Sequence, residues 1–136
     1  MIVITQRFGF KADTTPERKE AVLAAMRRTS AVESTSFSFV GPELGDADDG
    51  LTHGYCVAIP DLAALERYIH DPAHLAGDPE ILPYLARLTH VRFSDDSDPH
   101  LNEKIIAMHQ KKLAMYPDWE RLLNAIPSGA PEPHRA

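Results

Sequence analysis

Long apolar runs, an excess of basic residues and paired cysteines are all missing from this chain of 136 residues. Because no apolar run is long enough to cross a bilayer, and the N-terminus reads as a strand rather than a signal sequence, we expect no membrane partner. The 14 basic and 20 acidic residues give a net charge of −6, which argues against nucleic acid as a partner. The single Cys56 excludes an internal disulfide and a thiolate metal site. We therefore expect a cytoplasmic protein in which Cys56 is a small buried hydrophobic residue.

What the chain does contain is an ordered series of strand and helix patterns. Apolar residues that alternate with polar ones predict strands, and apolar stripes behind capping residues predict helices. Thr15 before Pro16 is a typical helix start, and Pro72 ends or kinks the second helix just past Asp71. The predicted strands are 2–10, 31–40, 51–59 and 88–93, the helices start at residues 16 and 60–61, and a short helical turn is predicted near residues 79–88. This order is the ferredoxin-like α+β pattern, βαββαβ, with one antiparallel sheet that carries both helices on one face.

A helical extension follows this predicted domain. We expect the domain to span residues 1–94, the extension 95–127 and a disordered tail 128–136, where apolar content is too low for packing. The extension has a loose apolar stripe made of Leu101, Ile105, Met108 and Met115. It can cover a pocket or enlarge an interface between copies, and the sequence favours the interface.

The predicted sheet has one face without helices. A second copy of the chain is the simplest cover for such a face, so we expect a homodimer that forms through the sheet.

The stretch "LERYIHDPAHL" (65–75) contains the candidate chemistry. A tyrosine hydroxyl can donate a hydrogen bond to an oxyanion, and a histidine can remove a proton near neutral pH, so Tyr68 and His74 form a candidate acid–base pair. The alternative is structural: a buried tyrosine and a histidine that caps a loop. His70 and His74 have the i, i+4 spacing of paired metal ligands, but Pro72 interrupts the helix between them and we expect no metal site.

Polar residues on the predicted strands extend this candidate site. His53 and Tyr55 share one face of their strand, and Leu88, His90 and Arg92 share one face of theirs. If these faces are turned toward the helices, then His53, Tyr55, His90 and Gln6 approach Tyr68 and His74 around a cavity. If the alternation has the opposite phase, the same side chains lie in the dimer interface.

The segments "MIVITQRFGFKADTTPER", "THGYCVAIPDLAALERYIHDPAHL" and "LTHVRF" resemble the stress-responsive dimeric α/β-barrel (Dabb) family over residues 1–94. The resemblance implies ferredoxin-like subunits whose sheets pair face to face in a homodimer. The family includes stress proteins and polyketide cyclases of the olivetolic acid cyclase type, which need no metal or organic cofactor. On that pattern His74 matches the general base, Tyr68 the residue that positions the carbonyl, and His53 a histidine of the same pocket. The chain departs from the pattern at Ile4, where a histidine is common, at His90, and in "LAGDPE" after the motif.

Two functions follow from the residues and the resemblance together. The first is a cofactor-independent enzyme that acts on a small carbonyl compound, for example in an aldol-type cyclisation. His74, Tyr68 and His53 are then the catalytic residues, and Tyr55, His90, Gln6 and Leu88 bind the substrate. The second is a non-catalytic, stress-responsive homodimer that binds a small molecule in the same cavity.

Overall fold

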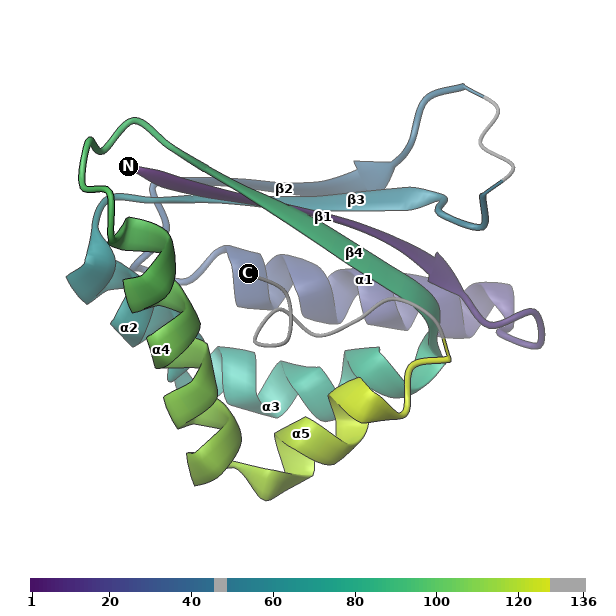
Figure 1. Cartoon of the computed structure of the whole chain (residues 1–136). Helices are drawn as coiled ribbons and strands as arrows, with labels where there is room; N and C mark the ends of the chain where they lie inside the picture. The colour runs from purple at the N-terminus through teal and green to yellow at the C-terminus, as the bar shows by residue number, and fades with distance from the viewer. Residues whose placement is uncertain (46–48, 128–136) are drawn as a thin grey trace.

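One antiparallel sheet and five helices make up the part of the chain that the computed structural model describes, residues 1–45 and 49–127. The strand order is β2-β3-β1-β4, and every neighbouring pair is antiparallel. The helices all lie on one side of the sheet (Figure 1). This is the ferredoxin-like arrangement that the sequence predicts. The strands are β1 (Ile2–Phe10), β2 (Phe37–Pro42), β3 (His53–Ile59) and β4 (Leu85–Ser94).

The helices begin where their capping residues predict. The Thr15 side chain accepts a hydrogen bond from the Arg18 N–H, and the Asp61 side chain accepts one from the Ala64 N–H. Each bond satisfies one of the amide groups that a first helical turn leaves without a partner. The helices are α1 (Pro16–Ser30), α2 (Leu62–Ile69), α3 (Pro72–Ile81), α4 (Leu101–Met115) and α5 (Pro117–Asn124), with a short 3₁₀ turn, η1 (Leu82–Tyr84), before β4.

Pro72 does more than end the second helix, because it starts a new one. The Asp71 side chain caps α3 by accepting a hydrogen bond from the Ala73 N–H, and Pro72 occupies the first turn. His74 therefore lies in the first turn of a helix of ten residues, where the sequence predicted only a short turn further on. The chain ends α2 at Ile69 and starts α3 at Pro72, and the His74 ring then packs on the ring of Tyr68 in α2.

Five predicted strand bounds are wrong. Three differ by one or two residues: β2 ends at Pro42, β3 starts at His53 and β4 ends at Ser94, where residues 40, 51 and 93 were predicted. β2 starts at Phe37 instead of residue 31, because Thr35 Oγ1 donates to the carbonyls of Ser30 and Val32 and holds residues 31–36 in a turn. β4 starts at Leu85, three residues before its predicted start. The middle of the predicted loop 41–50 and the predicted tail 128–136 lie outside the described residues.

The phase of the strands is now settled. Gln6 on β1 pairs with Tyr55 on β3 and with His90 on β4, so the three side chains share one face of the sheet. Tyr55 is buried at 5% exposure beneath the helices. The cavity-forming phase that the sequence left open is therefore the one the structure has.

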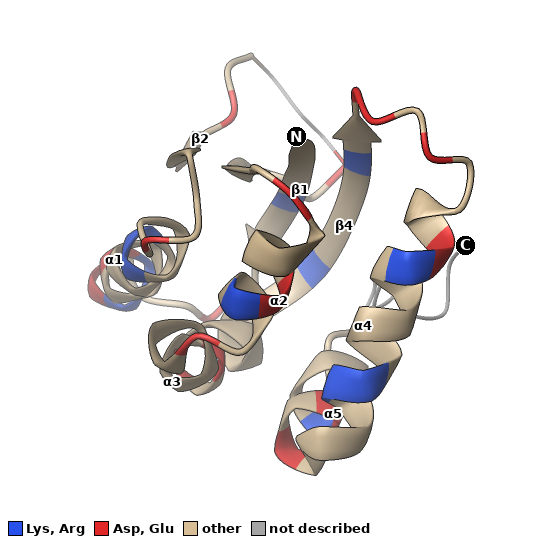
Figure 2. Ribbon diagram, turned by 90° about the vertical axis from the view of Figure 1, so that its left-hand side faces the viewer, with Lys and Arg blue, Asp and Glu red and all other residues tan. Residues whose placement is uncertain are grey.

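The extension covers the helix side of the domain. Figure 2 shows α1 near β2, α2 and α3 in the middle, and α4 with α5 beyond them near β4. α4 packs on α2, and α5 packs on α3. Residues of the extension line the cavity, as in the first of the two roles that the sequence left open, while its part in an interface between copies stays a prediction. The structure corrects the predicted stripe, because Met115 is 52% exposed while Lys112 is buried at 1%.

The close approach of β1 to the loop before β3 predicts a specific sensitivity at Gly9. A Cβ atom at Gly9 would lie 1.7 Å from the backbone carbonyl oxygen of Gly50. Because backbone has to move to relieve that overlap, we expect Gly9→Ala to lower the free energy of unfolding by about 1–3 kcal/mol in urea denaturation. Gly41→Ala is the matched control, since a Cβ there meets nothing within 4 Å. Equal midpoints for the two variants would contradict the prediction.

Candidate functional site

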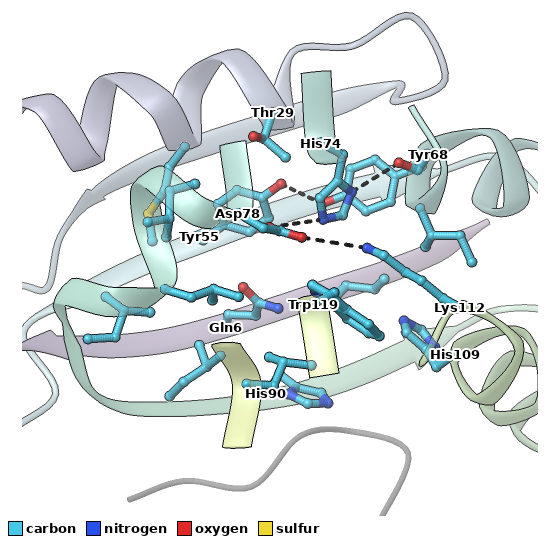
Figure 3. A pocket seen from close by; sticks show the side chains of 18 of the residues that line it. Gln6, Thr29, Tyr55, Tyr68, His74, Asp78, His90, His109, Lys112 and Trp119 are labelled. Atoms are coloured by element: carbon cyan, nitrogen blue, oxygen red, sulfur yellow. Dashed lines mark hydrogen bonds and ion pairs between the residues drawn. The ribbon is translucent and has the colours of Figure 1, made fainter. Parts of the chain in front are cut away.

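A cavity of about 110 Å³ lies between the sheet, α3 and the extension (Figure 3). Its walls are mostly apolar and include Ile4, Leu85 and Leu88 from the strands and Ile81 from α3. An apolar pocket with a few converging polar groups is the usual form of a small-molecule site. The polar groups that line it include those of Gln6, Tyr55, Tyr68, His74, Asp78 and Lys112.

Six of the seven residues predicted from the sequence line this cavity. They come from β1, β3, β4, α2 and α3, so the fold brings together segments that are far apart along the chain. The six are Gln6, Tyr55, Tyr68, His74, Leu88 and His90.

His53 does not line the cavity, which corrects its predicted place. It lies on the helix-facing side of β3, as expected, but two residues before Tyr55, which is roughly 6.6 Å further along the strand. There its ring stacks on Phe8 and meets Phe10 edge to face. Phe8 is fully buried, so His53 packs against the aromatic core and not against the residues that line the cavity.

Tyr55 and Tyr68 meet at their hydroxyl groups. The two oxygens form a short hydrogen bond deep in the cavity wall. Burial raises the pKa of both phenols well above the usual value, so both carry their protons at neutral pH. Two hydroxyls hold two protons and only one lies between them, which leaves one O–H to donate to a third oxygen.

The tautomer of His74 follows from its backbone contact. His74 Nδ1 lies 3.0 Å from the Tyr68 carbonyl oxygen, which can only accept, so Nδ1 carries the proton. Burial and the nearby Lys112 charge lower the pKa of His74 to about 3. The ring is neutral at physiological pH, and its Nε2 holds a free lone pair.

Asp78 faces that lone pair from the next turn of α3. The His74 Nε2 to Asp78 Oδ1 distance is 3.7 Å, beyond a hydrogen bond, and both atoms are acceptors. The negative charge of the carboxylate attracts a proton that arrives at Nε2. The pair is therefore arranged to capture a proton.

Asp78 also joins the extension to the domain. Its Oδ2 lies 3.7 Å from Lys112 Nζ, and that ammonium sits 4.1 Å from the ring centroid of Trp119 on α5. Burial raises the pKa of Asp78 to about 6, and the Lys112 charge opposes the rise. Burial lowers the pKa of Lys112, while Asp78 holds it up. At neutral pH the pair is a buried carboxylate and ammonium.

The sequence analysis missed Asp78 and Lys112. Each had a signal: Asp78 stands four residues after His74, on the same face of a helix, and Lys112 stands seven residues after Ile105 in the apolar stripe. The first was hidden because α3 was not predicted over those residues. Lys112 was not predicted because only the apolar residues of α4 were assigned to the buried stripe.

His70, the other half of the possible metal pair, points elsewhere. Its Nδ1 lies 3.3 Å from the Tyr116 hydroxyl, between the two C-terminal helices and the end of α2. Within residues 1–45 and 49–127, no group of three or more His, Cys, Asp or Glu side chains is placed to hold a metal ion. In the same part of the chain no helix is long and apolar enough to cross a membrane.

Comparison with known proteins identifies the domain. The family described as "Stress responsive A/B Barrel Domain" (Dabb) matches residues 4–95. Among curated proteins, none matches the chain significantly.

Solved structures share the fold at low identity. A dimeric ferredoxin-like protein of unknown function from Thermobifida fusca is 23% identical, with a TM-score of 0.61 over 68% of this chain and 89% of its own. A Dabb family protein from Mesorhizobium loti is 21% identical, with a TM-score of 0.59 over 71% and 97%. A hydroxynitrile lyase from Passiflora edulis is 16% identical, with a TM-score of 0.62 over 71% and 94%.

The lowered pKa of His74 predicts a pH-dependent stability. The unfolded chain binds a proton at His74 near the ordinary pKa of 6.5, whereas the folded chain binds it only near 3. As pH falls through this window the unfolded state gains stability, so the free energy of unfolding falls by up to about 1.4 kcal/mol per pH unit. His74→Gln removes that dependence. We expect the stability of the unsubstituted protein relative to His74→Gln to fall steadily on acidification in urea titrations.

The stability that Asp78 contributes has the opposite pH dependence. Asp78 is present both in the unsubstituted protein and in His74→Gln. Its raised pKa gives stability at low pH that is lost as pH rises through about 6, and this largely cancels in the comparison. His100→Gln is the matched control, because that ring is 67% exposed at the start of α4 and its removal should change stability by less than about 0.5 kcal/mol. A relative stability of His74→Gln that does not change with pH would show that the imidazole is hydrated in the folded protein.

Proposed function

Because the chain belongs to the stress-responsive A/B barrel (Dabb) family, we propose that its cavity is the active site of a cofactor-independent enzyme acting on a small carbonyl compound. The reaction is proton removal at the carbon beside the carbonyl, followed by bond formation or cleavage at that carbon. The observation that carries the proposal is the meeting of a neutral His74 with a buried tyrosine pair at one cavity.

His74 is the base in this proposal. The Tyr68 carbonyl fixes the proton on Nδ1, which leaves the Nε2 lone pair for the substrate. A base with a low pKa is weak by itself, but Asp78 stabilises the imidazolium once it forms. The lowered pKa keeps the ring unprotonated at neutral pH, and the Asp78 carboxylate lies 3.7 Å from the nitrogen that receives the proton.

The tyrosine pair is the oxyanion donor. Tyr68 stacks against the His74 ring with centroids 4.6 Å apart, so a substrate at Nε2 is near the phenol as well. The free O–H of the Tyr55–Tyr68 pair would donate to the carbonyl oxygen and stabilise the enolate as charge develops. Its buried position makes that donation stronger than it would be in water.

The size of the cavity favours small substrates. An apolar cavity of about 150 Å³ binds benzene, so one of about 110 Å³ suits a compound with a single ring or a short chain. An aldol-type cyclisation fits the chemistry when the reacting part of the substrate has this size. The hydroxynitrile lyase among the solved structures adds support, because that enzyme has the same fold.

The bare sheet face supports a homodimer as the functional unit. Phe37, Phe39, Val91 and Phe93 are each more than half exposed and lie on the face away from the helices. Such a patch on a folded protein marks an interaction surface. Dimeric relatives with this fold make a second copy the proposed partner.

The test of the proposed activity is deuterium exchange at the α-carbon of cyclopentanone, followed by proton NMR in D₂O at neutral pH. We expect the protein to accelerate exchange over buffer. His74→Gln should lower the rate by about 10²–10⁴-fold, the usual range for a general base. Tyr68→Phe should lower it by about 10²–10³-fold, as expected for an oxyanion donor.

His53→Gln is the matched control for this test, because His53 lies behind Phe8 and outside the cavity. It should keep the rate of the unsubstituted protein. If cyclopentanone shows saturation-transfer contacts with the protein but no accelerated exchange, the protein is the non-catalytic binder and the proposed enzyme is wrong.

The dimer interface has its own test. Phe93→Asp places a charge on the exposed apolar sheet face, so we expect the mass in light scattering to fall from dimer to monomer. Leu44→Asp is the control, since Leu44 is 94% exposed on a loop, and the dimer mass should remain. A dimer that survives Phe93→Asp would place the interface on another surface.

A further inference from the structure

Lys112 is the most deeply buried charged residue that lines the cavity, and the proposed chemistry has not used it. It lies on α4 at 1% exposure, while lysines normally extend their ammonium group to water. Its Nζ is placed between the Asp78 carboxylate and the Trp119 ring, at 3.7 Å and 4.1 Å. Figure 3 shows the side chain reaching from the extension toward Asp78 at the cavity wall.

A lysine in this position meets two requirements for nucleophilic attack on a carbonyl carbon, a neutral amine and a nearby proton acceptor. Only the neutral amine attacks a carbonyl carbon, and burial favours the neutral form. The carboxylate next to it can take the amine proton. A buried carboxyl group with a pKa near 6 is suited to giving that proton back.

We propose that Lys112 forms an imine with the carbonyl carbon of the substrate, inside the same cavity. The proposal deepens the proposed function and rests on it for the carbonyl substrate. The substrate class is a small aldehyde or ketone with a hydrogen on the adjacent carbon. The residue lies outside residues 4–95, so this chemistry belongs to the extension and not to the family domain.

The reaction balances with the groups present. Asp78 takes one proton from the Lys112 ammonium, and the nitrogen lone pair then forms a bond to the carbonyl carbon. The second N–H proton moves to the former carbonyl oxygen, which gives a carbinolamine. Protonated Asp78 gives its proton to the hydroxyl, water leaves, and the nitrogen lone pair forms the C=N bond. The product is an iminium cation beside the Asp78 carboxylate, with one water released.

The iminium links Lys112 to His74. A positive nitrogen on the former carbonyl carbon draws electrons from the adjacent C–H bond and makes that proton more acidic. Asp78 lies between the two residues, 3.7 Å from each. His74, which lines the same cavity, would be the base that removes the proton that the Lys112 adduct has activated.

The test uses pentane-2,4-dione as the probe with the full chain. A neutral lysine amine converts this diketone into a conjugated enaminone, which absorbs in the near ultraviolet and adds one diketone minus one water to the mass. We expect one adduct per chain, mapped to Lys112 by peptide mass spectrometry. Lys112→Arg keeps the positive charge beside Asp78 but has no amine nucleophile, so it should lose the adduct.

Two variants make the result specific. Lys104→Arg is the matched control, since Lys104 is 53% exposed on the same helix, and the adduct should remain. Asp78→Asn should slow adduct formation by removing the proton acceptor, while Trp119 fluorescence reports whether the extension is still folded. An adduct on several lysines, or one that persists in Lys112→Arg, overturns the proposal.

The outcome for Lys112 is separable from that for the proposed function. Cyclopentanone exchange that needs His74 but is unchanged in Lys112→Arg, with no enaminone formed, overturns the imine and leaves the acid–base enzyme. An enaminone on Lys112 without any accelerated exchange supports the nucleophile and overturns the acid–base enzyme. Exchange that is lost in both His74→Gln and Lys112→Arg, with the enaminone on Lys112, supports both.

Discussion

The buried pair of Asp78 and Lys112 is the constraint on which the site depends. An ammonium and a carboxylate each lose several kcal/mol of hydration when buried, and only a close partner offsets that loss. Asp78 is 8% exposed and Lys112 is 1% exposed, so water hydrates their charges only slightly. Removing one partner of such a pair leaves an uncompensated charge, at a cost on the order of 3–5 kcal/mol. The pair therefore holds α4 over α3 and so fixes the wall of the cavity.

The sequence predicted the parts of this protein that depend on local signals. Alternation along residues 2–10 and the Thr15 cap depend on neighbouring residues, and both lie where they were predicted. The tyrosine and histidine of the candidate site were also predicted, because they belong to one short segment. The prediction left open which face of its strand His53 occupies. The structure gives it the helix-facing side, but it lies two residues before Tyr55 and packs on Phe8, outside the cavity. The ion pair joins two helices, and only the tertiary fold brings its members together.

The site is built from two parts with different chemistry. The family domain contributes a histidine that has lost its charge to burial, two protonated tyrosines and the Asp78 carboxylate. The extension contributes a cation. Solved relatives cover 68–71% of the chain, so what they do concerns the first part. Two proteins of this family can thus share the part of the cavity that the domain forms and differ in the charge that faces Asp78.

The order of these two parts along the chain has a consequence during translation. The sheet and α3 are complete before the ribosome has made α4, and domains generally fold as their residues emerge. In that interval Asp78 has no ammonium beside it, so its carboxyl group must stay hydrated or bind a proton. The side of the cavity that α4 later covers is then open to solvent. The cavity therefore has its complete wall only after α4 and α5 have been made and have packed onto the domain.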